Sequence, residues 1–143
     1  MTAPSRARPA LHGSGLAGNS LVTLLVLTLS GCISGPEPTV AVFEVSSGQQ
    51  FTVELATPEL VEHAQRLLAG ENLAMVPSGD VVRGESSVNE PWSWHIDPMT
   101  LEFSNVTIVE CDGSPQRVEE AVDAFERYCP WSAQVIAVEG PGL

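Results

Sequence analysis

TVAVFEVSSGQQFTVELATPELVEHAQRLLAG, residues 39–70, is the stretch that decides the fold. Its first half contains two runs of β-branched and aromatic residues, at 39–45 and 50–56, separated by the turn-forming letters SSGQ. This pattern predicts a β-hairpin. In the second run apolar residues alternate with polar ones, which is typical of a strand with one buried face.

The second half of the stretch predicts an α-helix. Thr57 can cap its N-terminus, Pro58 suits the first helical position, and Gly70 suits the C-terminal stop. His63 falls outside the apolar stripe and is expected on the exposed side. The stripe itself recurs at helical spacing and consists of Leu60, Val61, Ala64, Leu67 and Leu68.

The segments that follow the helix predict more strands. Residues 71–80 should form a loop, and short strands are expected at 81–85 and 92–96. LEFSNVTIVEC, residues 101–111, predicts a long strand. Its apolar alternation changes phase in the middle, so a bulge near Ser104–Asn105 is expected.

A second helix and a last strand complete the pattern. Ser114 can cap this helix and Pro115 can open it, and we expect it to continue as far as Cys129–Pro130. The last strand is expected at 133–139. The order predicts an α+β sandwich, with a mainly antiparallel sheet of about five to six strands and two helices packed on one face.

The N-terminus predicts an exported lipoprotein. Arg6 and Arg8 give a positive start, and the apolar run at 21–29 suits a signal peptide, because a spanning helix needs roughly 20 residues. Leu29-Ser30-Gly31-Cys32 resembles the bacterial lipobox. That resemblance implies cleavage before Cys32 and lipidation of its sulfur.

The predicted organisation therefore has three parts. Residues 1–31 are the signal peptide, residues 32–39 are the lipidated cysteine and a tether, and residues 40–140 are a single α+β domain. The expected location is the cell envelope, with the acyl chains in a membrane and the domain facing the periplasm or the exterior.

The charge of the mature chain is strongly negative. All 18 acidic residues lie after Cys32, and the chain has no lysine. Four basic residues remain after cleavage, so the formal charge there is −14: Arg66, Arg83, Arg117 and Arg127. Such a surface is repelled by phosphate, which excludes nucleic acid as a partner and leaves membrane attachment to the acyl chains.

Cys111 and Cys129 are the cysteines left after Cys32, and an oxidising compartment favours a disulfide between them. A helix running through 115–128 would separate them by about 21 Å, whereas bridged Cα atoms lie about 5.5 Å apart. The disulfide therefore requires a shorter helix or a chain that turns back near Arg127. Two buried thiols are the alternative.

PWSWHIDP, residues 91–98, is the richest candidate for a site. On a strand, Ser93, His95 and Asp97 share one face and the tryptophans share the other. A Ser–His–Asp triad is not expected, because neighbours on one strand face stand about 6.6 Å apart and a nucleophile needs its base within about 3 Å.

A metal site at His95 and Asp97 is also not predicted. It would need further carboxylates, with Glu102, Glu110 and Asp112 the available ones. The simpler interpretation is a polar strip that bonds to itself, the backbone and water. We predict no catalytic residue, no metal and no cofactor.

The tryptophans can serve a core or a ligand surface. Trp94 is expected in the core of a small domain with few other aromatic residues. Trp92 and Trp131 stand beside loops, and an indole offers a large apolar face and a polar N–H to a ligand. The candidate ligand-binding residues are therefore Trp92, Ser93, His95, Asp97 and Trp131.

The segments FTVELATPELVEHAQRLLAG, PWSWHIDPMTLEF, VTIVECDGSP and CPWS together resemble the small calmodulin-binding-protein-like domain family of exported bacterial proteins. The resemblance covers about residues 40–140 and implies no enzymatic activity. Calmodulin binding is not expected here, because calmodulin selects basic amphipathic helices and the outer faces of both predicted helices are mostly acidic.

These observations predict a lipid-anchored, non-enzymatic binding module of the bacterial envelope. Its partner is an unknown protein or glycan. The alternative is a metal-dependent or acid–base hydrolase that uses His95 and Asp97.

Overall fold

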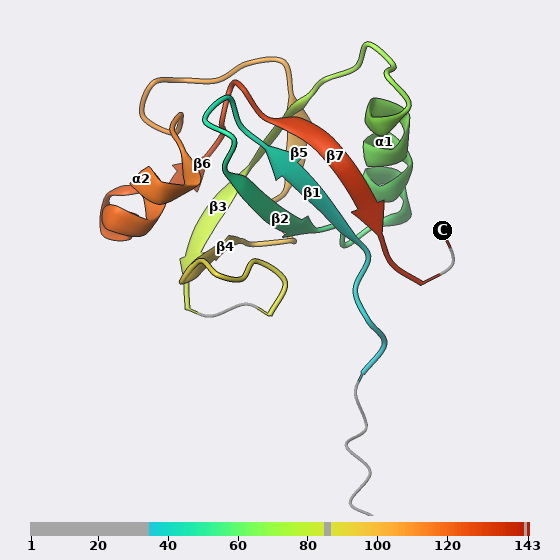
Figure 1. Cartoon of the computed structure of the whole chain (residues 1–143), viewed down its shortest axis with the longest axis horizontal. Coiled ribbons are helices and arrows are strands. Elements are labelled where there is room, and N and C mark those ends of the chain that lie inside the picture. Colours follow the sequence, from blue (N-terminus) through green and yellow to red (C-terminus); the bar gives the residue numbers. More distant parts are fainter. Residues whose placement is uncertain (1–34, 85–86, 142) are drawn as a thin grey trace, which may run out of the picture. The chain divides into compact units, whose positions relative to one another are not determined.

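The computed structural model describes residues 35–84, 87–141 and 143. The predicted signal peptide, Cys32 and the first part of the tether lie outside these residues. The described chain forms two antiparallel sheets and two α-helices around a shared core (Figure 1). The predicted α+β class is thereby confirmed, with the strands divided between two sheets.

The first sheet contains β1 (Val40–Glu44), β2 (Gln50–Glu54) and β7 (Gln134–Glu139). The strand order is β2-β1-β7, so β2 and β7 are its edges. The predicted hairpin is confirmed: Phe43 pairs with Phe51, and Gly48 takes a positive φ of 78° in the turn. Because that conformation suits glycine, the turn sequence fixes the register.

The second sheet is built around β3 (Val76–Arg83), which pairs in succession along its length with three short strands. These are β5 (Glu102–Ser104), β6 (Arg127–Tyr128) and β4 (Trp94–Ile96). The expectation of a loop as far as residue 80 was wrong at its C-terminal end. β3 begins earlier because its first four residues are buried between their neighbours.

The first helix, α1 (Pro58–Leu68), matches its prediction, and the Thr57 side chain accepts the Leu60 N–H. The expected exposure of His63 was wrong. Its ring stacks on Phe103 with centroids 4.3 Å apart, and Nε2 lies 2.6 Å from the main-chain oxygen of Ala74. The side chain of Phe103 from β5 therefore covers the imidazole ring.

The second helix is shorter than predicted. α2 covers Pro115–Glu120, a 3₁₀ turn follows at Val122–Ala124, and the chain then enters β6. Tyr128 is fully buried and pairs with Gly79 across the sheet, a contact that no helix through 128 could make. A distant strand therefore ends the local helical pattern.

The predicted long strand at 101–111 was also wrong in its extent. It ends at Ser104, and the following segment is a loop that exposes Val106, Ile108 and Val109. The phase change in the sequence marks the end of the strand rather than a bulge within it.

Four aromatic side chains form the centre of the core: Phe43, Phe51, Trp94 and Tyr128. The Phe43 and Phe51 rings stack at 5.4 Å, and Tyr128 meets both Phe51 and Trp94 edge to face at 5.2 Å. Residues from α1 and α2 pack against the same cluster. Both sheets and both helices therefore depend on this one core.

Candidate ligand-binding site

The segment 91–98 has two faces, as its strand pattern predicted. Trp94 and Ile96 are buried in the core. Trp92 is half-buried, and its ring lies 6.4 Å from that of Trp94. The tryptophan side of the segment therefore belongs mainly to the fold.

Trp92 also caps an open sheet edge. Its Nε1–H donates to the main-chain oxygen of Gln50 at 2.8 Å, and the Asn89 Oδ1 accepts the main-chain N–H of Thr52 at 2.8 Å. Asn89 is fully buried, and its Nδ2 donates to the oxygen of Trp94. The two side chains thus satisfy outward-facing backbone groups of β2, which is one way to protect an edge strand.

The role of Asn89 could not be predicted from the sequence. It stands in a stretch of loop-forming residues, and a polar loop residue is usually exposed. Its partners lie 37 residues upstream and on β4, so no local signal points to them.

The polar strip does not converge on one point. Ser93 bonds to Glu119 of α2, with Oγ donating at 2.7 Å and the main-chain N–H at 2.9 Å. The Asp97 carboxylate accepts the N–H of Met99 at 2.9 Å. Nδ1 of His95 is buried without a hydrogen-bond partner among the described residues. Two of the three side chains are thus committed to fixing α2 and the β4–β5 turn.

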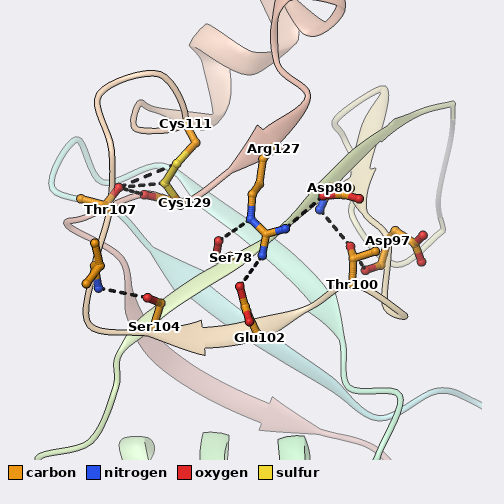
Figure 2. A network of polar contacts seen from close by, with 11 residues as sticks. Ser78, Asp80, Asp97, Thr100, Glu102, Ser104, Thr107, Cys111, Arg127 and Cys129 are labelled. Carbon is orange, nitrogen blue, oxygen red and sulfur yellow. Dashed lines mark hydrogen bonds and ion pairs between the residues drawn. A yellow bond between two sulfur atoms is a disulfide. The ribbon is translucent and has the colours of Figure 1, made fainter.

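Arg127 ties three strands of the second sheet together (Figure 2). Its Nε donates to Ser78 Oγ at 2.9 Å, and its terminal nitrogens donate to Asp80 at 3.1 Å and Glu102 at 2.5 Å. The main-chain N–H of Asp80 continues the network by donating to Thr100. In Figure 2, each nitrogen of the guanidinium group bonds to another side chain of the protein, so this cluster stabilises the fold.

Cys111 and Cys129 are joined as a disulfide, with Cα atoms 5.1 Å apart (Figure 2). The main-chain N–H of Cys129 donates to the oxygen of Cys111 at 2.8 Å, and the Thr107 hydroxyl donates to the oxygen of Cys129 at 2.6 Å. The short α2 makes this approach possible, because the chain turns back before β6. The structure thus has the shorter helix that a disulfide between these cysteines requires.

Trp131 lies two residues after Cys129 and is 57% exposed. Its main-chain N–H donates to the Asp112 carboxylate at 2.9 Å, and the next residue, Ser132, accepts the N–H of Ser46 through its hydroxyl. Pro130 before it is fully buried. The indole is therefore exposed on a turn whose backbone is held on both sides.

Trp131 borders a hollow of about 500 Å³ between the hairpin turn and the start of β7. A second hollow, of about 310 Å³, begins at the C-terminal end of α1, and Met75 and Gln134 line both. Both volumes are in the range of ligand pockets. We call the two together the Trp131 groove, with Trp131, Glu44, Met75, Ile136, Val135 and Glu71 on its walls.

Comparison with known domain families gives a match over residues 37–141, to the family described as the BP-74 N-terminal domain. The chain belongs to this family. The match confirms that the segments quoted above belong to a known domain family. No curated protein and no solved structure matches the chain.

Each arginine of the described residues interacts with another side chain of the protein. Arg66 donates twice to Glu71, at 2.9 and 2.7 Å, and these bonds hold the pKa of Glu71 below its ordinary value. Arg83 pairs with Asp123, and Arg117 lies over the Phe125 ring at 5.7 Å. With Arg127 in its network, no described arginine is left to neutralise Glu44.

No group of three or more His, Cys, Asp or Glu side chains among the described residues is arranged to hold a metal ion. None of their helices has the length and apolar character needed to cross a bilayer.

Proposed function

We propose that this domain is a non-enzymatic binding module of the bacterial envelope, lipid-anchored through Cys32 and facing the periplasm or the exterior. The observation that carries the proposal is Trp131, a large apolar side chain held in solvent beside a hollow. Exposed indoles in fixed positions are favoured at binding surfaces, because little conformational entropy is lost when a partner covers them.

The position of the Trp131 groove in the domain suits an anchored protein. Residues 35–39 lead into the first residue of β1 (Figure 1). Glu44, the last residue of that strand, lines the groove. Five strand residues span roughly 15 Å. The groove therefore lies at the opposite end of β1 from residues 35–39, and we propose that it is left free for a partner.

In this proposal, the other candidate residues from the sequence do not contact the partner. Trp92 and Ser93 use their polar atoms within the fold, at Gln50 and Glu119. His95 and Asp97 remain candidates for the alternative, a hydrolase. That alternative is the weaker proposal, because the Asp97 carboxylate bonds to the Met99 backbone and no hydrogen bond joins it to His95.

The likeness to calmodulin-binding-protein-like domains is retained for domain identity alone. Calmodulin is acidic, and a mature chain of charge −14 would repel it. We expect purified calmodulin, with or without calcium, to show no binding.

A photo-crosslinking amino acid in place of Met75 tests the binding function in living cells. Met75 lines both hollows, so a partner seated in the groove should be captured there, identified by mass, and shown to bind the purified full-length chain. The same crosslinker at Val109, an exposed apolar residue of another loop, is the control. Equal capture at both positions, or none at Met75, would reject the proposal.

The anchor is tested separately. Cys32→Ser should abolish labelling by a fatty-acid analogue and release the chain from membranes, with the domain still folded. Continued lipid labelling of the variant would contradict the proposed anchor.

A further inference from the structure

We propose that the Trp131 groove binds an extended protein segment that carries arginine or lysine. The cationic side chain lies on the Trp131 indole beside Glu44, and the main chain of the segment pairs with β7 at Val135. This inference rests on the proposed binding function and names the chemistry of the partner.

The first support is the uncapped main chain of β7 at Val135. The main-chain N–H of Val45 donates to Gln49 and that of Leu55 donates to Thr39, so odd-numbered residues of β1 bond to β2. Even-numbered residues therefore bond to β7, where Glu44 pairs with Gln134. The N–H and C=O of the next residue, Val135, which pairs with Phe43 just before a bulge at Ile136, then point away from β1.

The two edges of this sheet are treated differently. At β2, Asn89 and Trp92 occupy the outward backbone groups. At β7, α1 packs against the strand and a bulge lies at Ile136, but no described side chain bonds to the main chain of Val135, and the second hollow lies beside that residue. An uncapped residue at a sheet edge, next to a hollow, offers main-chain groups with which an added strand can pair.

The second support is the shape of the groove. The two hollows share Met75 and Gln134 and follow one another from Trp131 to the end of α1. Met75 and Ile136 are 46% and 43% exposed. A strand placed here would direct alternate side chains to apolar and to charged walls, which suits an extended segment better than a compact ligand.

The third support is charge. Glu44 contacts no described arginine, and its carboxylate accepts only from Gln50 Nε2, at 3.1 Å. An indole face attracts a cation, and the surrounding excess of carboxylates raises the local concentration of positive partners. The same negative net charge on each chain, −12 over the whole sequence, disfavours a second copy as the occupant.

The test uses the full-length chain in nonionic detergent and short capped peptides with a fluorescent label. One peptide alternates valine and arginine, a second replaces arginine with neutral citrulline of the same shape, and a third has N-methylated amides at alternate positions. We expect the arginine peptide to bind roughly tenfold more tightly than the citrulline peptide, since a desolvated cation–π pair contributes about that factor. N-methylation should weaken binding as well, because it removes main-chain donors.

Variants of the chain distinguish binding in the Trp131 groove from nonspecific electrostatic attraction between a cationic peptide and the acidic protein. Trp131→Ala should weaken binding of the arginine peptide roughly tenfold and Glu44→Gln several-fold. Glu54→Gln is the matched control and should leave the affinity unchanged. Glu54 lies on the same sheet, pairs with Val40 at the tether end, and is not part of the groove.

The outcomes distinguish the inference from the function on which it rests. Equal affinity for the arginine and citrulline peptides, or no effect of Trp131→Ala, overturns the cationic segment. Binding of a cell-wall glycan in the groove, insensitive to salt, overturns it too, while the binding module survives. The same conclusion follows if a partner is captured at Met75 in cells but the purified chain does not prefer the arginine peptide to the citrulline peptide. Failure of both experiments rejects both proposals.

Discussion

The indole N–H of Trp92 donates to the main-chain oxygen of Gln50 at 2.8 Å, on the outer edge of β2. Asn89 occupies the neighbouring N–H of Thr52. β7, at the other side of the same sheet, packs against α1 but has no such cap at Val135 among the described residues. The segment that looked most like a site in the sequence helps to cap the β2 edge, and the groove lies beside the uncapped Val135.

Removing the buried cap should be costly. Asn89→Ala would leave the N–H of Thr52 and the oxygen of Trp94 without partners, and we expect a loss of about 2–4 kcal/mol in the free energy of unfolding. Urea denaturation measures it. Asn105→Ala, at an exposed loop position, is the control and should change the value by less than about 0.5 kcal/mol. Equal effects at the two positions would contradict the edge-capping role.

Trp92→Phe tests the second cap with a smaller change. The ring keeps most of its contact with Trp94 but loses the bond to Gln50, so we expect a loss of about 1 kcal/mol. The same denaturation experiment applies. A variant as stable as the natural chain would show that water replaces the indole N–H at no cost.

The sequence predicts those parts of the fold whose signals are local. The hairpin and α1 carry their own turn, cap and stop residues, so both were correct. The apolar spacing of Val118, Val122 and Phe125 also fits a helix, but α2 ends at Glu120 and the chain goes on to pair Tyr128 with Gly79. Likewise, Val106 and Ile108 alternate like a buried strand although they are exposed.

The features of the candidate site also divide into those that the local sequence predicts and those that depend on long-range packing. The exposure of Trp131 was predicted from its place beside a loop, and the side chain is exposed. The groove itself could not be predicted, because it brings together residues from β1, β7 and the segment before β3. The commitments of Ser93 to Glu119 and of Asn89 to Thr52 depend on the same long-range assembly.

Tyr128 predicts how stability changes in alkaline solution. Burial, and in addition the charge of Asp112, raise the pKa of this tyrosine well above its ordinary value of 10.0. The folded state therefore holds the neutral phenol. The stability that the buried neutral phenol contributes is complete below about pH 10. It is lost as the pH rises above that value, where only the unfolded chain ionises.

The measurement is unambiguous because Tyr128 is the one tyrosine of the chain. Tyrosinate absorbance should appear only as the protein unfolds. Tyr128→Phe should remove this part of the pH dependence and lose about 1 kcal/mol with the bond to Gly113. Ionisation at an ordinary pKa in the folded protein would contradict the burial.

The disulfide should contribute through the loop that it closes. Cys111 and Cys129 are 18 residues apart, which corresponds to about 3 kcal/mol in the chain-entropy account. We expect reductant to lower the midpoint of thermal unfolding. The double variant Cys111→Ser, Cys129→Ser should start at the lower midpoint and not respond to reductant. A response by that variant would place the effect elsewhere.

Arg127 offers a test of a polar network against an isolated ion pair. Arg127→Met keeps much of the apolar stem but removes the bonds to Ser78, Asp80 and Glu102, and Ser78 is itself buried. We expect a loss of about 1–2 kcal/mol, since the exposed carboxylates contribute little individually and the buried hydroxyl loses its donor. Arg83→Met is the matched control: it removes one exposed ion pair, with Asp123, and should cost less than about 0.5 kcal/mol. Denaturation of both variants at low and high salt measures the difference, and salt should diminish only the part due to the carboxylates. If the two variants lost equal stability, Arg127 would be one more surface pair, and the cohesion of β3, β5 and β6 would come from their backbone bonds and the core alone.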